Sequence, residues 1–100
     1  MSYEVAFTDE ASQQIVDLED YLAERFSSVN AERYIDRLTL ACLSLGKAPH
    51  RGTMRDDLKP GIRVIGFERR VAIYFTAVEK RVVILGILYA GRAFTPPTDE

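Results

Sequence analysis

The side chains that could perform chemistry in this sequence are few. His50 is its one histidine, so a histidine-based triad would have to use a residue that lies in a polar loop beside Pro49. Cys42 is its one cysteine and falls on the apolar side of a predicted helix, where a packed thiol is commoner than a nucleophile. Asp56 and Asp57 are neighbours in sequence and need not point at one substrate. We therefore expect no catalytic residue, no metal site and no cofactor.

Arginine is the residue type that remains. Arg63 begins a predicted strand, and Arg92 follows the last predicted strand, with Tyr89 three residues before it. Arginine without a general base is suited to recognising phosphate or carboxylate, and not to turnover. We expect Arg63, Tyr89 and Arg92 to bind the target of this protein. Three further arginines are interpreted as solvated turn residues: Arg69, Arg70 and Arg81.

Charge is distributed unevenly along the chain. Residues 1–46 carry three basic and nine acidic side chains, a net charge of −6. Residues 47–92 carry ten basic and four acidic side chains, a net charge of +6, and the last two residues bring the total to −2. Either the basic half faces an acidic partner, which could be nucleic acid or an acidic protein segment, or the two halves complement each other within the fold.

Length and composition indicate one soluble domain. A chain of 100 residues, 47% of them hydrophobic, suits a single ordered domain over residues 1–100. Its first residues lack the basic and apolar regions of a secretory signal. The longest apolar run, residues 82–90, is far shorter than the roughly 20 residues that span a bilayer. We expect a cytoplasmic protein that does not contact a membrane.

The first half of the chain predicts a strand and two helices. Residues 3–7 alternate in polarity, and Thr8 can then cap a helix that runs to about Phe26. Asn30 can cap a second helix with a broad apolar stripe, and Gly46 suits the C′ position after it. Because the link between the two amphipathic helices is short, we expect an antiparallel helical hairpin.

The second half of the chain predicts a loop and a sheet. Residues 47–61 form a basic loop with turn signals, and three strand-like runs follow at residues 62–67, 71–78 and 82–89. Their connectors are short enough for hairpins, so we expect a three-stranded antiparallel meander and an α+β fold class. The tail, residues 93–100, contains two prolines and is expected to fray.

Apolar residues occur on both faces of this predicted sheet. In the last strand, one side carries Val82, Ile84 and Leu88, and the other carries Val83, Leu85, Ile87 and Tyr89. Two helices can cover one face, which leaves more apolar surface than a monomer normally exposes. Either a partner covers the second face, or loop 47–61 and the tail do. The sheet and the apolar stripe of the second helix together offer a groove for a partner helix or strand. The residues that we expect at this contact are Leu38, Leu45, Ile65, Val71, Ile73 and Phe75.

Five segments together resemble the RelE/ParE toxins of bacterial type II toxin–antitoxin pairs. They are YEVAFTDEA from Tyr3, the spaced D-L-x-D-Y from Asp17, AERYIDRL from Ala31, RDDLKPGIR from Arg55 and ILYAGR from Ile87. The order and spacing of these pieces, which span residues 3–92, carry the resemblance. It implies an N-terminal strand, a helical hairpin and a curved antiparallel sheet. It also implies a co-expressed antitoxin, ParD-like or another small protein, whose C-terminal segment wraps the toxin.

The RelE/ParE superfamily divides by target. RelE-like members cut mRNA on the ribosome with basic residues on the sheet, whereas ParE-like members poison DNA gyrase. Arg63 and Arg92 match two of the RelE basic positions, and Tyr89 lies where some relatives carry histidine. However, Ile65 and Val71 stand where RelE-like members place further basic residues. The helical hairpin and the segment from Arg55 to Arg63 look more like ParE.

The resemblance therefore favours a ParE-like gyrase toxin that a cognate antitoxin neutralises, in a heterotetramer or a larger assembly. One alternative is a ribosome-dependent mRNA endonuclease of the RelE branch, in which Arg63, Tyr89 and Arg92 would be the catalytic residues. A second alternative is an attenuated protein that keeps the toxin fold and serves as a binding module.

Overall fold

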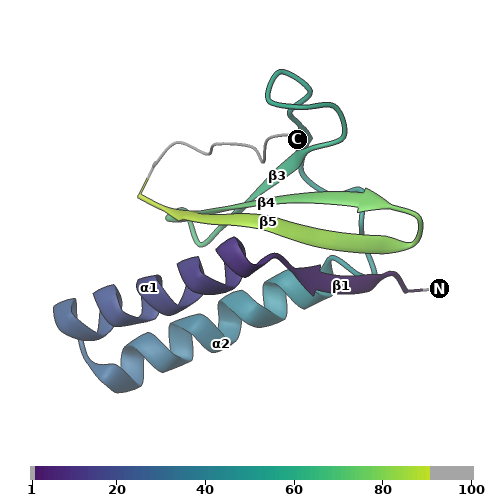
Figure 1. Cartoon of the computed structure of the whole chain (residues 1–100). Helices are drawn as coiled ribbons and strands as arrows, with labels where there is room; N and C mark the ends of the chain where they lie inside the picture. Colours follow the sequence, from purple (N-terminus) through teal and green to yellow (C-terminus); the bar gives the residue numbers. More distant parts are fainter. Residues whose placement is uncertain (1, 91–100) are drawn as a thin grey trace.

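The computed structural model describes residues 2–90, in which two helices pack on one face of a five-stranded mixed sheet (Figure 1). The elements are β1 (Glu4–Phe7), α1 (Asp9–Arg25), α2 (Ser28–Ser44), β2 (Thr53–Met54), β3 (Arg63–Phe67), β4 (Val71–Val78) and β5 (Arg81–Tyr89). The sheet order is β1-β5-β4-β3-β2. The α+β class, the helical hairpin and the antiparallel β3–β4–β5 meander are confirmed. The sequence did not predict β2, or that β1 pairs in parallel with β5.

Side-chain caps define where the two helices begin. The Thr8 hydroxyl oxygen accepts a hydrogen bond from the Ala11 N–H at 3.1 Å, so the predicted cap of α1 is confirmed. The predicted cap of α2 was wrong, because α2 begins three residues earlier than expected. Ser27 caps it, with its hydroxyl oxygen accepting from the Asn30 N–H at 3.1 Å. Asn30 lies inside the first turn, because serine and asparagine cap about equally well and serine comes first.

Gly46 is required for a close approach between segments and not for a left-handed helix cap. The residue after α2, Leu45, is right-handed, and Gly46 is not among the residues with positive φ. The Tyr3 N–H donates to the Gly46 carbonyl oxygen at 2.7 Å. A Cβ at Gly46 would lie 2.6 Å from the Tyr3 carbonyl oxygen. Gly46 thus occupies the predicted C′ position without the left-handed conformation usual there, and it lets the N-terminal segment pack beside the end of α2.

Most of the core lies between the helical hairpin and the sheet. Five of the six residues expected to contact a partner lie in it, each at most 3% exposed: Leu38, Leu45, Val71, Ile73 and Phe75. The helices already cover these side chains, so no partner reaches them in this conformation. The sixth, Ile65, is half-buried and packs against the edge of the same core.

A β-bulge in β5 changes which side chains face the helices. Tyr74 pairs with Gly86, but Phe75 pairs with Ile84, which leaves Leu85 as the extra residue. A bulge inserts one residue and so reverses the alternation beyond it. The side chains of β5 that belong to the core or pack against it are Val82, Ile84, Ile87 and Tyr89. The prediction that Ile87 and Tyr89 oppose Val82 and Ile84 was wrong for this reason.

The loop at residues 47–61 forms part of the sheet edge. Its β2 pairs with β3 through Thr53–Val64 and Met54–Arg63. On the sheet face away from the helices, Tyr74 is 9% exposed and interacts with the loop residue Arg55. The loop thus covers part of the second sheet face, as one of the two alternatives drawn from the sequence expected. The tail, residues 93–100, which that alternative also invoked, lies outside the described residues.

Candidate functional site

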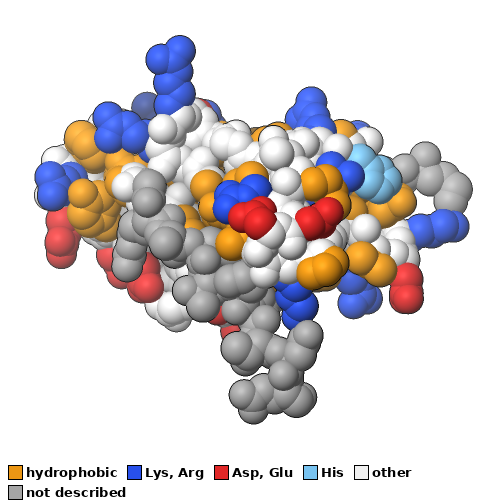
Figure 2. All heavy atoms as spheres, turned by 90° about the horizontal axis from the view of Figure 1, so that it is seen from above, with side chains coloured by type: hydrophobic (Ala, Val, Ile, Leu, Met, Phe, Trp, Pro, Cys, Tyr) orange, Lys and Arg blue, Asp and Glu red, His pale blue; other side chains and the backbone are white. Residues whose placement is uncertain are grey.

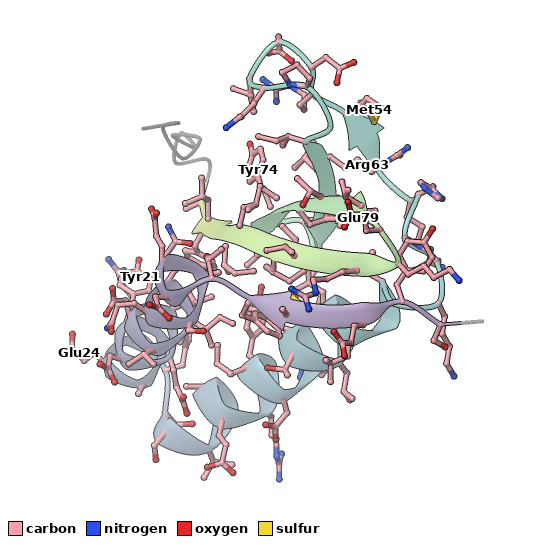
Figure 3. The ribbon with its side chains drawn as sticks, turned by 45° about the vertical axis from the view of Figure 1, so that its right-hand side comes forward. Tyr21, Glu24, Met54, Arg63, Tyr74 and Glu79 are labelled. Atoms are coloured by element: carbon pink, nitrogen blue, oxygen red, sulfur yellow. The ribbon has the colours of Figure 1, made fainter. Side chains whose placement is uncertain are left out.

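Arg63 anchors the loop that precedes β3. Its Nη1 donates to the His50 carbonyl oxygen at 2.8 Å and lies 3.5 Å from that of Arg51. Arg63 and Met54 stand on the paired strands at this edge (Figure 3). The His50 ring in turn meets the Tyr3 ring edge-on, with centroids 6.2 Å apart. The guanidinium therefore has a structural partner, and a target would use its remaining donors.

Tyr89 lies at the other end of the sheet. It pairs with Val71, which pairs with Phe67, whereas Arg63 begins β3 four residues before Phe67. Four residues along a strand and two strand spacings across the sheet put Arg63 and Tyr89 roughly 16 Å apart. The structure does not bring these two expected target-binding residues into one site. The third, Arg92, lies outside the described residues.

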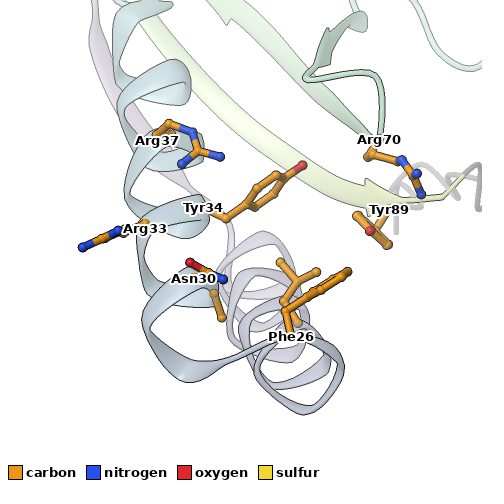
Figure 4. A pocket seen from close by; sticks show the side chains of 9 residues that line it. Phe26, Asn30, Arg33, Tyr34, Arg37, Arg70 and Tyr89 are labelled. Carbon is orange, nitrogen blue, oxygen red and sulfur yellow. The ribbon is translucent and has the colours of Figure 1, made fainter.

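A pocket of about 510 Å³ lies where α1 turns into α2, facing the β3–β4 turn and the end of β5 (Figure 4). We call it the hairpin-tip pocket. Its apolar and aromatic wall consists of Leu22, Phe26, Ala31, Tyr34 and Tyr89. Its polar lining consists of Asn30, Arg33, Arg37 and Arg70. Among residues 2–90, the pocket thus combines three arginines with an apolar wall, and no carboxylate residue lines it.

The arginines of the hairpin-tip pocket differ in their partners. Arg37 makes a two-pronged ion pair with Glu68, with donor–acceptor distances of 2.8 and 3.0 Å, and this pair is exposed. The hydrogen bond from Arg37 lowers the pKa of the Glu68 carboxyl. Among residues 2–90, no carboxylate pairs with Arg33 or Arg70. The pocket therefore has a positive charge that the described part of the chain does not neutralise.

Tyr34 contributes a buried hydroxyl beside these arginines. Its ring packs edge-on against Phe67 at 5.5 Å between centroids, and the Arg37 guanidinium lies 5.4 Å from its centre. Its hydroxyl is buried and has no hydrogen-bond partner among the described residues. Burial is the main cause that raises the pKa of Tyr34. In Figure 4 the hydroxyl extends from α2 toward the side where Arg70 and Tyr89 lie. An unsatisfied buried hydroxyl costs about 1–3 kcal/mol, so the site favours a hydrogen-bond acceptor.

The helical hairpin also exposes apolar side chains. Leu40 is 66% exposed, and Val29 and Leu43 are exposed with it. These three residues of α2 are spaced by 11 and three positions, which places them on one face of the helix. A face of this kind, opposite the buried stripe of α2, is typical of a surface that contacts another protein.

Other candidate chemistry is absent from the described residues. Cys42 is fully buried, and burial raises the pKa of its thiol to about 12, as expected for a core thiol. Within residues 2–90, no group of three metal-ligating side chains comes together, and no helix is long and apolar enough to cross a membrane.

Comparison with known proteins identifies the family. A model of the ParE toxin of the type II toxin–antitoxin system parDE matches residues 5–94. The chain belongs to the ParE toxin family. A solved structure titled "Chromosomal ParDE TA system from P. aeruginosa" is similar, with a TM-score of 0.78 and 19% identity over 89% of this chain and 97% of that one. Because the sequence identity is only 19%, the similarity to this solved structure supports the fold of the chain and nothing more. A search of curated proteins found no significant match.

The ParE family match confirms the RelE/ParE resemblance and its closer likeness to the ParE branch. This chain is therefore a ParE-type toxin of a type II toxin–antitoxin system. The hairpin-tip pocket was not predicted, because Arg70 lies in a short polar connector that is typical of a solvated turn. A signal for it was available: Arg33 and Arg37 are one helical turn apart and flank Tyr34. The contact between this turn of α2 and the β3–β4 connection is long-range and has no local signature.

Proposed function

We propose that this ParE-family toxin inhibits DNA gyrase and that a cognate antitoxin neutralises it by direct binding. The observation that carries this choice of target concerns two sheet positions. Val71 is 3% exposed and Ile65 packs against the core, where the RelE branch would place basic side chains. RNA cleavage relies on cationic groups aimed at the charge that develops on the phosphate. Apolar side chains at these positions, buried at Val71 and half-buried at Ile65, favour a toxin that acts by binding a protein.

The distribution of basic residues on the sheet supports the same proposal. Viewed from the side opposite the helices, Lys and Arg side chains stand apart around the molecule and form no single cluster among the coloured atoms (Figure 2). Arg63 and Tyr89 would contact separate parts of a large target, because they lie at opposite ends of the sheet. We retain both, together with Arg92, as proposed target contacts.

For the antitoxin, the proposed contact moves from the core to the exposed face of α2. The new candidates are Val29, Leu40 and Leu43, with the half-buried Ile65 retained. An amphipathic helix or an added strand of the antitoxin would bury them. Such a partner binds the folded toxin and not the unfolded chain, so it should raise the melting temperature by mass action. The toxin–antitoxin assembly would be a heterotetramer or larger. The toxin would act in the cytoplasm, where gyrase works.

Induction of the toxin in bacteria tests this proposal. We expect filamentation, an SOS response and gyrase-linked DNA breaks, all reversed by co-expression of the antitoxin. Codon-phased cuts in mRNA at the ribosomal A site, with translation stopping first, would favour the RelE alternative. An attenuated binding module would cause neither effect when the antitoxin is absent.

Two matched variants test the antitoxin face. Leu40→Asp should remain toxic but escape the antitoxin, because it places a charge in the proposed apolar contact. Val78→Asp is the control, since Val78 is also exposed but ends β4, away from α2. Rescue that is equal in both variants would remove the α2 face from the proposal.

A further inference from the structure

We propose that the hairpin-tip pocket receives a carboxylate side chain of the antitoxin. This inference rests on the proposed function, because it assumes that an antitoxin binds the toxin. It adds the place and the chemistry of one contact, which adjoins the apolar face of α2 on the side of Arg33 and Arg37. The pocket is formed by the end of α1 and the turn after it, the first half of α2, the β3–β4 turn and the end of β5.

The donors in the pocket call for a ligand that only accepts hydrogen bonds. Arg33 and Arg70 bring guanidinium groups with no carboxylate partner in residues 2–90, and Tyr34 brings a buried hydroxyl with none. A guanidinium group has hydrogen-bond donors and no acceptor, and a phenol hydroxyl can also donate a hydrogen bond. An ionised carboxylate accepts from both groups and makes short, charge-assisted hydrogen bonds. Its entry would neutralise part of the charge of the pocket, and it would satisfy the Tyr34 hydroxyl once a small side-chain shift uncovers that atom, which solvent does not reach in the free toxin.

The surroundings of the pocket favour a protein carboxylate over nucleic acid. Leu22 and Phe26 give the pocket an apolar wall, and Phe26 is 67% exposed, so an apolar side chain next to the acid has a surface to cover. The helices that flank the pocket carry exposed acidic side chains, among them Asp20, Glu24 and Glu32. Figure 3 shows Glu24 pointing outward from this part of α1. A nucleic acid backbone would carry a row of phosphates past these acidic side chains, whereas a partner with one carboxylate among apolar neighbours places a single negative charge, next to the arginines of the pocket.

The matched pair Arg70→Gln and Arg69→Gln tests the charge of the pocket. Both remove one positive charge from the same turn, but only Arg70 lines the pocket. In titration calorimetry with the antitoxin, Arg70→Gln should weaken binding about 10- to 100-fold, the usual worth of a hydrogen-bonded charge. Arg69→Gln should remain within about twofold of the wild type. Equal losses in the two variants would overturn the proposal, because they would report net charge alone.

Tyr34→Phe separates binding from structure. Removing a buried hydroxyl without a partner should leave the melting temperature of the free toxin unchanged or raise it. The same change should weaken antitoxin binding, since the bound carboxylate loses a donor. A purely structural role would instead lower the melting temperature. Unchanged affinity in Tyr34→Phe together with unchanged affinity in Arg70→Gln would overturn the proposal.

A scan of the antitoxin identifies the carboxylate. Each Asp is changed to Asn and each Glu to Gln, and every variant is titrated against wild-type and Arg70→Gln toxin. At one acidic position, the antitoxin substitution should weaken binding to wild-type toxin but should hardly weaken binding to Arg70→Gln toxin. Such non-additive losses are expected for two residues in contact. Additive losses at every acidic position would overturn the proposal. If the antitoxin does not bind wild-type toxin at all, the proposed function has failed, and this inference fails with it.

Two other occupants are tested with the same variants. A single-stranded oligonucleotide that binds the wild type and is lost in Arg70→Gln would assign the pocket to a phosphate and overturn the carboxylate. The acidic end of the toxin itself is tested with Asp99→Asn combined with Glu100→Gln. If the toxin's own acidic end fills the pocket, this double variant and Arg70→Gln should lower the melting temperature of the free toxin by similar amounts. That result, together with unchanged antitoxin affinity in Arg70→Gln, would overturn the proposal.

Discussion

Replacing Gly52 by alanine should destabilise the sheet edge that carries Arg63. Gly52 has a φ of +81°, and a Cβ there would lie 2.3 Å from the Val64 carbonyl oxygen. Ordinary contact needs at least 3.4 Å, so the two strands would have to separate by about 1 Å. The β2–β3 ladder consists of two residue pairs, so such a shift would break it and release the contact between Arg63 and the His50 carbonyl oxygen.

Gly61→Ala is the matched control for this perturbation. Gly61 has a φ of +89°, but nothing lies within 4 Å of a Cβ placed there. Both alanines bear a positive-φ strain of about 1–2 kcal/mol, partly offset by the lower entropy of the unfolded chain. Gly52→Ala should lower the free energy of unfolding by about 2–3 kcal/mol more. This loss comes from the steric conflict and from about two broken hydrogen bonds, each contributing about 1 kcal/mol.

Urea denaturation followed by circular dichroism measures both variants. The account expects the midpoint of Gly52→Ala to fall well below that of Gly61→Ala, with similar slopes. Equal losses in the two variants would contradict this prediction, because they would mean that β2 does not contribute to stability.

Three further predictions concern a turn, an ion pair and the thiol. Glu79 and Lys80 both have positive φ in the two-residue turn between β4 and β5. Because asparagine and glycine adopt positive φ most easily, replacing the two residues by Asn-Gly should stabilise the fold by about 1 kcal/mol. A lower melting temperature of this variant would contradict the prediction. Because Arg37 lowers the pKa of Glu68, their pair stabilises the fold above the ordinary carboxyl pKa of 4.5 and loses this effect as pH falls through the lower folded value. Stability should thus fall less steeply with acid in Arg37→Gln, and parallel pH profiles would contradict the pair. Cys42 should resist a thiol reagent at pH 8 in the folded toxin and react in urea, and rapid labelling without urea would be the contrary result.

Local signals in the sequence predicted most of the secondary structure. Alternation and helical spacing located β3, β4 and β5 to within a residue at each end, and a side-chain cap located the start of α1 at Thr8. The error at α2 came from a choice between two good caps, Ser27 and Asn30, which propensity cannot separate. The family resemblance added what local signals could not, namely the toxin class.

The features that the sequence did not predict depend on contacts between distant residues. The bulge at Leu85 inverts the faces of β5, and no residue type in a run of apolar side chains marks it. The same inversion turned Tyr89 toward α1, where its ring meets Tyr21 at 5.7 Å between centroids. Burial of Phe75 and its neighbours followed from how the hairpin covers the sheet, so an apolar pattern alone could not separate a core from a partner surface.

Supercoiling by purified DNA gyrase tests the central claim most directly. Toxin freed from its antitoxin is added to gyrase, relaxed plasmid and ATP, and translating ribosomes with mRNA are assayed in parallel by primer extension. The account predicts that supercoiling is blocked, that gyrase-linked DNA breaks accumulate, that antitoxin restores supercoiling, and that the mRNA stays intact. Normal supercoiling together with codon-phased mRNA cuts would contradict it.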